Sequence, residues 1–242
     1  MKTIVIIPAY NEEARIGGVI RGIVGLDIGL DIVVVNDGSF DGTCGCAKTE
    51  GAAVLNHPIN MGYGAALQTG YKYALENGYD IVVQMDGDGQ HDPKYIPYML
   101  DASSKEDVDV VIGSRFKQDS GYQAPVLRRL GMIFFGILVT LVTRRKTTDP
   151  TSGYQAIRRR VLPFLASEEF PCDYADADLL IMLYYNGFTT AEFPMQMYLN
   201  ERGKSMHSGI PGNLYYVFKI CLSIFLTVVR ENLKRGRREK CL

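Results

Sequence analysis

Two carboxylates, Asp86 and Asp88, stand one residue apart just after the segment Asp80-Ile-Val-Val83, which is apolar from Ile81 onward. A strand that ends in this way carries both acids into the loop at its carboxyl end. Oxygen ligands of this kind suit Mg²⁺ or Mn²⁺, and such a cation can hold a diphosphate. Gln90 adds a further oxygen, whereas His91 has no cysteine or other histidine near it to build a zinc site. The alternative interpretation is an acidic turn, since Asp-Gly pairs are common in turns.

A second polar segment, Pro8-Ala-Tyr-Asn-Glu12, leaves the strand expected at residues 3–7. Tyr10 offers a ring face on which a nucleobase could stack, and Glu12 offers a carboxylate for a ribose or a base edge. The alternative is a structural helix start, in which Asn11 caps the helix and an acid occupies the first turn.

Two further segments follow the next strands. In Asn36-Asp-Gly-Ser39, Asp37 could accept a hydrogen bond from the imide or amine of a base. Asn60-Met-Gly-Tyr-Gly64 is a short glycine-rich loop that leads into a helix and is similar to a phosphate cradle. Turns and helix caps use the same residue types, so each segment alone discriminates poorly.

These segments are separated by a regular alternation of apolar runs and helical patterns. Uniformly apolar runs are typical of parallel strands covered on both faces. The alternation predicts a doubly wound α/β sheet, with the ligand site outside the carboxyl ends of its strands. Strands are expected at residues 3–7, 31–35, 53–55, 81–85 and 108–112, and helices at about residues 12–24, 42–50, 64–77 and 93–102.

The second half contains two apolar segments with basic flanks. Residues 130–143 carry no charge and lie between Arg128-Arg129 and Arg144-Arg145-Lys146. As a helix this run would be about 21 Å long, short of the ~30 Å needed to cross a bilayer. Residues 214–229 are interrupted by Lys219 and precede a basic tail. Neither is predicted to span a membrane. They are either buried core helices or helices lying in the membrane interface, and the basic flanks favour the interface.

Composition narrows the class of protein. The 242 residues are 47% hydrophobic and 22% charged, which is ordinary for a globular chain. The formal net charge of −1 gives no reason to expect a nucleic acid as partner. Five cysteines without a Cys-x-x-Cys pair fit a reducing cytosol, and no signal peptide precedes the first strand. We therefore expect a cytosolic catalytic domain bound peripherally to the cytoplasmic face of a membrane.

Taken in order, these segments resemble the family 2 glycosyltransferases with the GT-A fold, and among them the dolichyl- or polyprenyl-phosphate sugar synthases. Gly113-Ser-Arg115, Asp149-Pro-Thr-Ser-Gly153 and Gly203-Lys-Ser205 complete the set. The resemblance implies a Rossmann-like, mostly parallel sheet flanked by helices, with C-terminal apolar helices at the membrane interface. The catalytic domain would cover residues 1–205, including an apolar interfacial helix at about 128–143. Residues 206–242 would form an amphipathic helix and the basic tail.

The same resemblance implies roles for individual residues. The nucleotide sugar would contact Pro8, Ala9, Tyr10, Glu12, Asp37, Asn60, Gly64, Asp86, Gly87, Asp88, Arg202 and Lys204. The metal would be held by Asp86, Asp88 and Gln90. The acceptor phosphate would meet Arg115, Arg129 or its neighbour Arg128, and Ser205. The catalytic candidates would be Asp149, Asp88 and Arg115, with Asp176 as a second candidate base.

The sequence departs from the family pattern at three points. Asn36 replaces the first acid of the usual Asp-Asp-Gly-Ser, although Asp37 is retained. Arg202 stands at a shifted position relative to Gly203-Lys-Ser205, which weakens its expected role as diphosphate clamp. The Glu-Asp base motif of many relatives is absent from residues 172–179. A phosphate acceptor is already ionised at neutral pH and needs no strong base, so the last departure favours such an acceptor.

The predicted activity is a Mg²⁺- or Mn²⁺-dependent, inverting transfer of a sugar from a nucleotide-diphosphate sugar to a polyprenyl phosphate at the membrane surface. A separate small membrane protein is a further candidate partner. The alternative is transfer to a saccharide hydroxyl in cell-surface polysaccharide synthesis. A nucleotidyltransferase would usually have a basic glycine-rich loop where this chain has Pro8-Ala-Tyr-Asn-Glu12, and a non-catalytic scaffold is disfavoured by the intact pair Asp86 and Asp88.

Overall fold

The computed structural model describes the backbone of residues 1–105, 108–117, 126–171, 177–198 and 210–239, and within these ranges the side chains outside 126–130, 210–217 and 235–239. The chain forms two compact units. The first consists of Met1–Tyr122, Ser152–Ala175 and Thr189–Asn200, and the second of Gln123–Thr151, Asp176–Phe188 and Glu201–Leu242. The predicted domain boundary at residue 205 stays a prediction.

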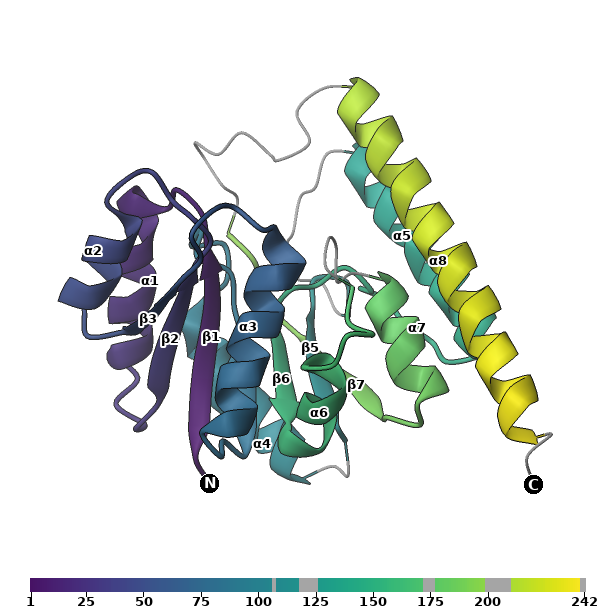
Figure 1. Ribbon diagram of the computed structural model, residues 1–242, viewed down its shortest axis with the longest axis horizontal. Coiled ribbons are helices and arrows are strands. Elements are labelled where there is room, and N and C mark those ends of the chain that lie inside the picture. Colours follow the sequence, from purple (N-terminus) through teal and green to yellow (C-terminus); the bar gives the residue numbers. More distant parts are fainter. Residues whose placement is uncertain (106–107, 118–125, 172–176, 199–209, 240–242) are drawn as a thin grey trace. The chain divides into compact units, whose positions relative to one another are not determined.

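The first unit is built on a mostly parallel sheet with the order β3-β2-β1-β4-β6-β5-β7 (Figure 1). Strand β6 runs antiparallel to both of its neighbours, and the other pairs are parallel. The α/β class and the first five strands were predicted from the sequence, whereas β6 and β7 were not. The strands are β1 (Thr3–Ala9), β2 (Asp31–Asn36), β3 (Ala53–Asn56), β4 (Ile81–Gln84), β5 (Val110–Ser114), β6 (Gln155–Arg158) and β7 (Thr190–Pro194).

Helices cover both faces of this sheet. Side chains of β1 alternate between the faces, so Val5 joins a buried cluster with Ile16 and Ile20 of α1, while Ile6 lies against Gly70 of α3. Burying each large aliphatic side chain in this way contributes roughly 1.5–3 kcal/mol. The helical elements of this unit are α1 (Glu13–Val24), α2 (Thr43–Thr49), α3 (Tyr63–Glu76), the short η1 (Pro93–Tyr95), α4 (Ile96–Lys105), η2 (Arg159–Val161) and α6 (Leu162–Leu165).

The second unit contains α5 (Val126–Thr143), α7 (Ala177–Tyr185) and α8 (Ile210–Glu239). Both α5 and α8 pack on α7. Helix α8 buries a stripe that includes Ile220 and Ile224. Among the helices in the described part of the chain, none combines the length and the apolar character that a membrane span requires.

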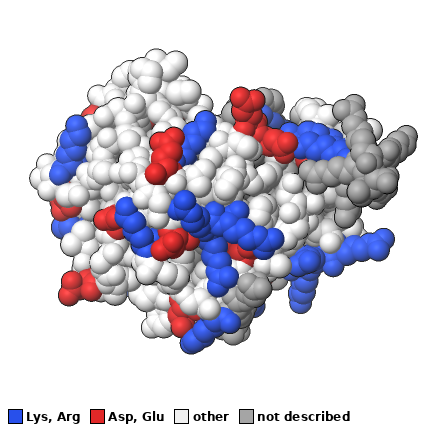
Figure 2. Space-filling model, turned by 60° about the horizontal axis from the view of Figure 1, so that its bottom comes forward, with Lys and Arg blue, Asp and Glu red and all other residues white. Residues whose placement is uncertain are grey.

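At the amino-terminal ends of the parallel strands, acidic residues bond to other groups of the protein. Figure 2 brings this side of the molecule forward and shows basic and acidic side chains interspersed on it. Asp80, just before β4, accepts a hydrogen bond of 2.7 Å from the backbone N–H of Lys2. Asp109, just before β5, pairs with Arg160 at 3.1 Å. The predicted ligand site lies at the opposite ends of these strands.

Candidate active site

The carboxyl ends of three adjacent strands carry most of the residues expected in the site. Strand β1 lies between β2 and β4, so the loops that follow these strands are neighbours. The N–H of Asp37 donates to the carbonyl of Ala9 over 2.9 Å, which ties the end of β2 to the end of β1. Gly87, beyond β4, lies against the carbonyl of Pro8. The sheet thus brings together the three segments that the sequence separates.

The loop after β4 holds the two candidate metal ligands. Asp88 accepts hydrogen bonds from the backbone N–H of Gln90 at 2.9 Å and from the side-chain amide of the same residue. The side chain of Asp86 remains 31% exposed. Burial raises the pKa of Asp86 above its usual range, while a hydrogen bond from Tyr63 and the positive charge of Arg115 oppose this rise. The structure therefore places Arg115 within electrostatic reach of Asp86.

The donor set fits a hard divalent cation. Asp86 and Asp88 supply carboxylate oxygens, the ligands that Mg²⁺ and Mn²⁺ prefer. Within the residues that the structure describes, no cluster of three or more His, Cys, Asp or Glu side chains gathers to enclose a metal. Gly153 borders Asp86: a Cβ added there would lie 3.2 and 3.3 Å from the Asp86 oxygens. Two protein carboxylates suit a cation whose remaining ligands come from a diphosphate and water.

His91 is a neighbour of Asp86. Its Nδ1 accepts the backbone N–H of Asp86 at 3.1 Å, and its ring stacks on Tyr154 with centroids 4.8 Å apart. Because Nδ1 accepts this hydrogen bond, its lone pair is engaged by the protein backbone and is not available to a metal. His91 thereby fixes the start of the candidate metal loop.

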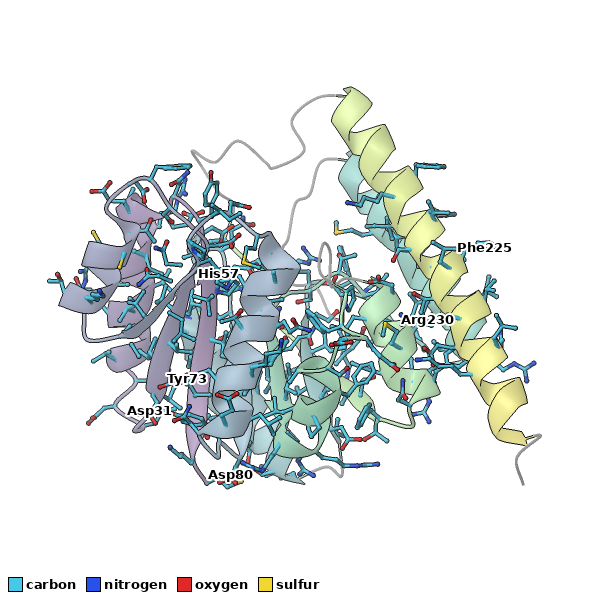
Figure 3. All side chains as sticks on the ribbon, in the orientation of Figure 1. Asp31, His57, Tyr73, Asp80, Phe225 and Arg230 are labelled. Carbon is cyan, nitrogen blue, oxygen red and sulfur yellow. The ribbon has the colours of Figure 1, made fainter. Side chains whose placement is uncertain are left out.

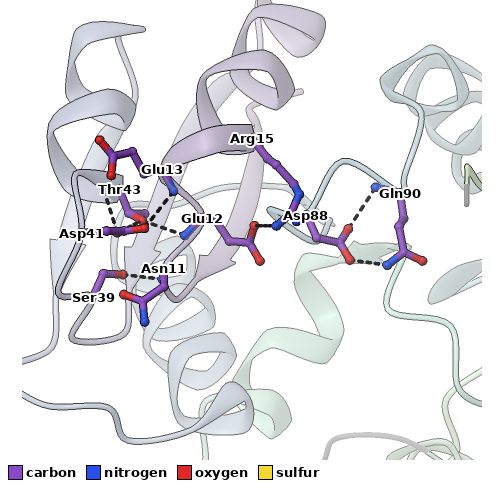
Figure 4. A network of polar contacts seen from close by, with 9 residues as sticks. All are labelled: Asn11, Glu12, Glu13, Arg15, Ser39, Asp41, Thr43, Asp88 and Gln90. Atoms are coloured by element: carbon purple, nitrogen blue, oxygen red, sulfur yellow. Dashed lines mark hydrogen bonds and ion pairs between the residues drawn. The ribbon is translucent and has the colours of Figure 1, made fainter. Parts of the chain in front are cut away.

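The loops after β1 and β2 are joined by reciprocal hydrogen bonds (Figure 4). The N–H of Asn11 donates to Ser39 Oγ at 3.0 Å, and Asn11 Oδ1 accepts the N–H of Phe40 at 2.9 Å. The prediction that Asn11 caps the first helix is wrong: α1 begins at Glu13, and Glu12 stands at its cap position. Asn11 instead adopts a left-handed backbone with φ 57°, a region that Asn enters more readily than most residues, and its side chain bonds the neighbouring loop.

Tyr10 and Glu12 lie on this joined pair of loops. Tyr10 is 42% exposed and meets the ring of Phe40 edge-on at 6.4 Å. Glu12 Oε2 pairs with Arg15 at 2.6 Å. Burial raises the pKa of Glu12, and the hydrogen bond and charge of Arg15 oppose this shift. An exposed aromatic face beside a partly buried carboxylate is suited to a base and ribose, although the two assignments stay predictions.

Asp37 is already engaged by the protein. The residue is 3% exposed, and its carboxylate accepts the N–H groups of Met61 and Gly62, each at 2.9 Å, and His57 Nδ1 at 2.7 Å. Gly38 makes the close approach possible, since its φ is 70° and an added Cβ would overlap the backbone of the Asn60 loop. The backbone N–H groups of Met61 and Gly62 are therefore already bonded to Asp37. Through these two hydrogen bonds, Asp37 fixes the position of the glycine-rich loop. Base contact by Asp37 stays a prediction.

The remaining predicted residues divide into three groups. Gly64 is buried in the first turn of α3. Asp149 is fully buried in the second unit, with Thr151 Oγ1 3.5 Å from its Oδ1, and its catalytic role stays a prediction. The side chains of Arg128 and Arg129 lie outside the described residues, as do Asp176, Arg202, Lys204 and Ser205.

Several residues of the site region were not predicted from the sequence. Tyr63 and Gln84 support Asp86, His57 supports Asp37, and Phe40 contacts Tyr10. One signal was present: Gln84 is a polar residue inside the apolar strand β4. A buried amide needs hydrogen-bond partners, so its position indicates a polar network behind the strand end.

Comparison with known proteins places the chain among related enzymes. Residues 4–164 match the family model described as glycosyl transferase family 2. The polyprenol monophosphomannose synthase of Mycolicibacterium smegmatis is 30% identical, over 86% of this chain and 82% of its own. The undecaprenyl-phosphate mannosyltransferase of Micrococcus luteus is 31% identical, over 86% and 88%. An uncharacterised protein of Methanocaldococcus jannaschii is 30% identical over 90% of each chain.

Solved structures confirm the GT-A type of fold. The glucosyl-3-phosphoglycerate synthase of Mycobacterium tuberculosis, crystallised with Mn²⁺ and UDP-glucose, aligns with a TM-score of 0.70 at 23% identity, over 94% of this chain and 78% of its own. The mannosyl-3-phosphoglycerate synthase of Rubrobacter xylanophilus aligns with a TM-score of 0.65 at 20% identity, over 100% and 76%. The family match covers two thirds of the chain, from β1 through β6 and including the candidate metal loop, so this chain belongs to glycosyl transferase family 2 and is a glycosyltransferase.

Proposed function

We propose that this glycosyltransferase moves a sugar, with inversion at the anomeric carbon, from a nucleotide-diphosphate sugar to a polyprenyl phosphate at a membrane surface, and that it uses Mg²⁺ or Mn²⁺. The observation that carries the proposal is the pair Asp86 and Asp88 at the carboxyl end of β4, where the positive charge of Arg115 acts on Asp86. Two relatives whose names state polyprenol or undecaprenyl phosphate chemistry support the acceptor class.

In the proposed reaction, an oxygen of the acceptor phosphate attacks the anomeric carbon of the sugar. The bond from that carbon to the diphosphate breaks, and the nucleoside diphosphate leaves with the electron pair. A divalent cation held by Asp86 and Asp88 would neutralise negative charge on the leaving group. The guanidinium of Arg115 would add positive charge beside the same phosphates, which is electrostatic stabilisation of the transition state.

A phosphate acceptor agrees with the charges that this chain offers. An ionised phosphate carries no proton that must be removed before attack, whereas a sugar hydroxyl requires a positioned base. The sequence lacks the Glu-Asp base motif of many relatives at residues 172–179. Arg115, Arg129 and Ser205 remain our candidates for contacts with the acceptor phosphate.

An apolar stripe on α8 supports the proposed membrane surface. Its exposed positions recur at helical spacing, and Phe225, 63% exposed, points outward from the helix (Figure 3). Basic residues follow directly in the sequence, and a basic helix with one apolar face binds at the boundary of anionic lipids. The exposed stripe consists of Phe218, Leu222, Phe225, Leu226, Val229 and Leu233. We propose that this stripe, with the exposed Ile137 and Leu141 of α5, rests on the bilayer that holds the lipid acceptor.

An acceptor competition tests this function. Purified protein, Mn²⁺ and radiolabelled UDP- and GDP-sugars are offered polyprenyl phosphate, 3-phosphoglycerate and a lipid-linked saccharide in the same reaction. We expect label on polyprenyl phosphate, as a phosphodiester. Label on a saccharide hydroxyl would instead establish the alternative function in polysaccharide synthesis, and label on 3-phosphoglycerate would reject a lipid acceptor.

A further inference from the structure

A chain of hydrogen bonds runs from the core of the first unit to Asp86. The hydroxyl of Tyr63, the first residue of α3, donates to Asp86 Oδ1 at 2.9 Å. The same hydroxyl oxygen accepts Gln84 Nε2 at 3.1 Å, and Gln84 Oε1 accepts the hydroxyl of Tyr71. Gln84 and Tyr71 are both buried. The buried polar groups of β4 and α3 therefore converge on one oxygen of a candidate metal ligand.

The direction of each hydrogen bond follows from the carboxylate. An ionised Asp86 can only accept, so the proton of Tyr63 points toward it. The oxygen of Tyr63 must then accept, and the amide nitrogen of Gln84 is the donor that faces it. This orientation turns the carbonyl of Gln84 toward the hydroxyl of Tyr71. All donors and acceptors in the chain are consistent with one another, as in a network that fixes one geometry.

The backbone that carries Tyr63 is held from the other side. Its two preceding residues, Met61 and Gly62, donate their N–H groups to Asp37. Gly153 closes a third side, because an added Cβ would lie 2.9 Å from the Tyr63 hydroxyl oxygen. The phenol thus has little freedom to move away from Asp86.

We propose that Tyr63 is a positioning residue for the metal-binding carboxylate of Asp86, with Gln84 fixing the phenol from behind. The inference rests on the proposed metal-dependent function. A carboxylate held at one oxygen loses less rotational freedom when it binds a cation, and hydrogen bonds to metal ligands commonly raise metal affinity in this way. A role limited to packing would change stability and leave metal affinity unaltered.

The test is Mn²⁺ binding to purified full-length protein, measured by isothermal titration calorimetry without nucleotide and again with saturating UDP or GDP, because a diphosphate would supply further ligands to the cation. The variant Tyr63→Phe keeps the ring and removes only the hydroxyl. The matched control is Tyr73→Phe, near the other end of the same helix (Figure 3). Ten residues of helix separate the two positions by roughly 15 Å. Melting curves verify that each variant is folded.

We expect Tyr63→Phe to bind Mn²⁺ roughly 10- to 100-fold more weakly than the wild type, and Tyr73→Phe to bind as the wild type does. Equal affinity of Tyr63→Phe and wild type would overturn the inference and leave the proposed function standing. A wild-type protein that binds neither Mn²⁺ nor a comparable divalent cation, alone or with UDP or GDP, would overturn the metal-dependent function and the inference with it.

A second variant, Gln84→Met, tests whether Gln84 affects Mn²⁺ affinity through Tyr63 or through a general change in the fold. Gln84→Met removes the donor to Tyr63 and is expected to weaken Mn²⁺ binding by a smaller factor. In the Tyr63→Phe background the same change is expected to have no further effect on Mn²⁺ affinity, because the residue it acts through has already lost its hydroxyl. Equal factors in both backgrounds would contradict the assigned path.

Discussion

Asp37 and Asp86 stand at the ends of two strands of the same sheet, yet their carboxylates meet different surroundings. Asp37 is saturated by two backbone N–H groups and His57, and its side chain is almost fully buried. Asp86 keeps one third of its side chain exposed and accepts Tyr63 at one oxygen. Asp37 therefore shapes the loop that carries Tyr63, while Asp86 retains oxygen surface for a ligand.

The first prediction concerns Asp37→Asn. Its new amide group would face an N–H donor of Met61 or Gly62, or the ring N–H of His57, and a buried donor left without an acceptor costs about 1–3 kcal/mol. We expect the free energy of unfolding, measured with urea, to fall by about this amount. The control Asp101→Asn, at an exposed surface pair with Lys105, is expected to change stability little. Unchanged stability of Asp37→Asn together with lost nucleotide binding would assign Asp37 to the base instead.

The second prediction concerns Gly153→Ala. The added methyl group would meet the Tyr63 hydroxyl and both Asp86 oxygens, so at least one of these groups must shift. Small displacements of catalytic groups can slow a reaction by up to about 100-fold, and we expect a drop of roughly 10- to 100-fold in the transfer rate. Gly45→Ala, where the added Cβ meets nothing within 4 Å, is the matched control. A Gly153→Ala enzyme with wild-type activity would show that the position of Asp86 is not critical.

At the scale of elements, helix α8 has one buried face and one exposed apolar face. Ile220, Ile224 and Thr227 are buried on one face, while Phe218 and Phe225 are exposed on the other. The packing of α8 on α7 accounts for the first face. The exposed aromatic residues are the anchors expected of a helix that rests on a bilayer.

The third prediction is that Phe225→Asp weakens binding to anionic vesicles by tenfold or more, measured by sedimentation. It removes a side chain worth roughly 1.5–3 kcal/mol when buried and adds a charge repelled by the lipid surface. Asn232→Asp, at an exposed polar position of the same helix, makes the same change of charge without removing an apolar group. Similar losses in both variants would attribute the effect to charge alone and contradict insertion of Phe225.

The candidate metal loop is fixed to the segment that follows β7. The N–H of Tyr198 donates to the carbonyl of Gln90 at 3.0 Å, and His91 forms a bridge with Met197. The hydroxyl of Tyr198 donates to Asp92 Oδ2 at 2.7 Å, and Lys94 pairs with the same oxygen. Partial burial raises the pKa of Asp92, but the hydrogen bonds from Lys94 and Tyr198 outweigh it and hold the pKa below its usual range.

The fourth prediction follows from the pKa of Asp92. A carboxyl group with a lowered pKa in the folded state stabilises the fold above its unfolded pKa, and this contribution is lost as the pH falls through the folded pKa. We expect the difference in unfolding free energy between pH 7 and pH 3 to be smaller in Asp92→Asn than in the wild type. Urea denaturation at both pH values measures it. Identical differences would mean that Asp92 contributes nothing to acid sensitivity.

At the scale of the whole first unit, the site lies where the strand order changes direction. From β1 the chain proceeds to β2 and β3 on one side, and then returns to β4 on the other side of β1. Loops diverge at such a point and leave room for a ligand outside the carboxyl ends of the strands. Asp37 and Asp86 belong to these loops, and Pro8 lies one residue before the end of β1.

The parallel strands β1 to β5 and the position of the site at their carboxyl ends were predictable from the sequence. Buried parallel strands produce uniform apolar runs, and the direction of each strand fixes where its carboxyl end lies. Strands β6 and β7 were missed for a physical reason. Gln155–Arg158 and Thr190–Pro194 mix polar and apolar residues and are short, and their pairing depends on partners far away in the chain. Local periodicity carries no information about such partners.

The candidate site was likewise predictable only in part. The acids at strand ends are visible as motifs, whereas the contact between Tyr63 and Asp86 depends on how α3 packs beside β4. Its only local trace is Gln84 within an apolar strand. The prediction that Asn11 is a helix cap failed because a side chain that can cap a helix can equally bond a neighbouring loop.

The central claim is metal-dependent transfer to a lipid phosphate, and one measurement tests it most directly. Wild type and Asp88→Ala are each incubated with polyprenyl phosphate, Mn²⁺ and the labelled UDP- and GDP-sugars, and label in the lipid fraction is counted with and without a chelator. The account predicts lipid label from one donor with the wild type, lost with the chelator and lost in Asp88→Ala. Undiminished transfer by Asp88→Ala or in the chelator, or no lipid label from any donor, would contradict it.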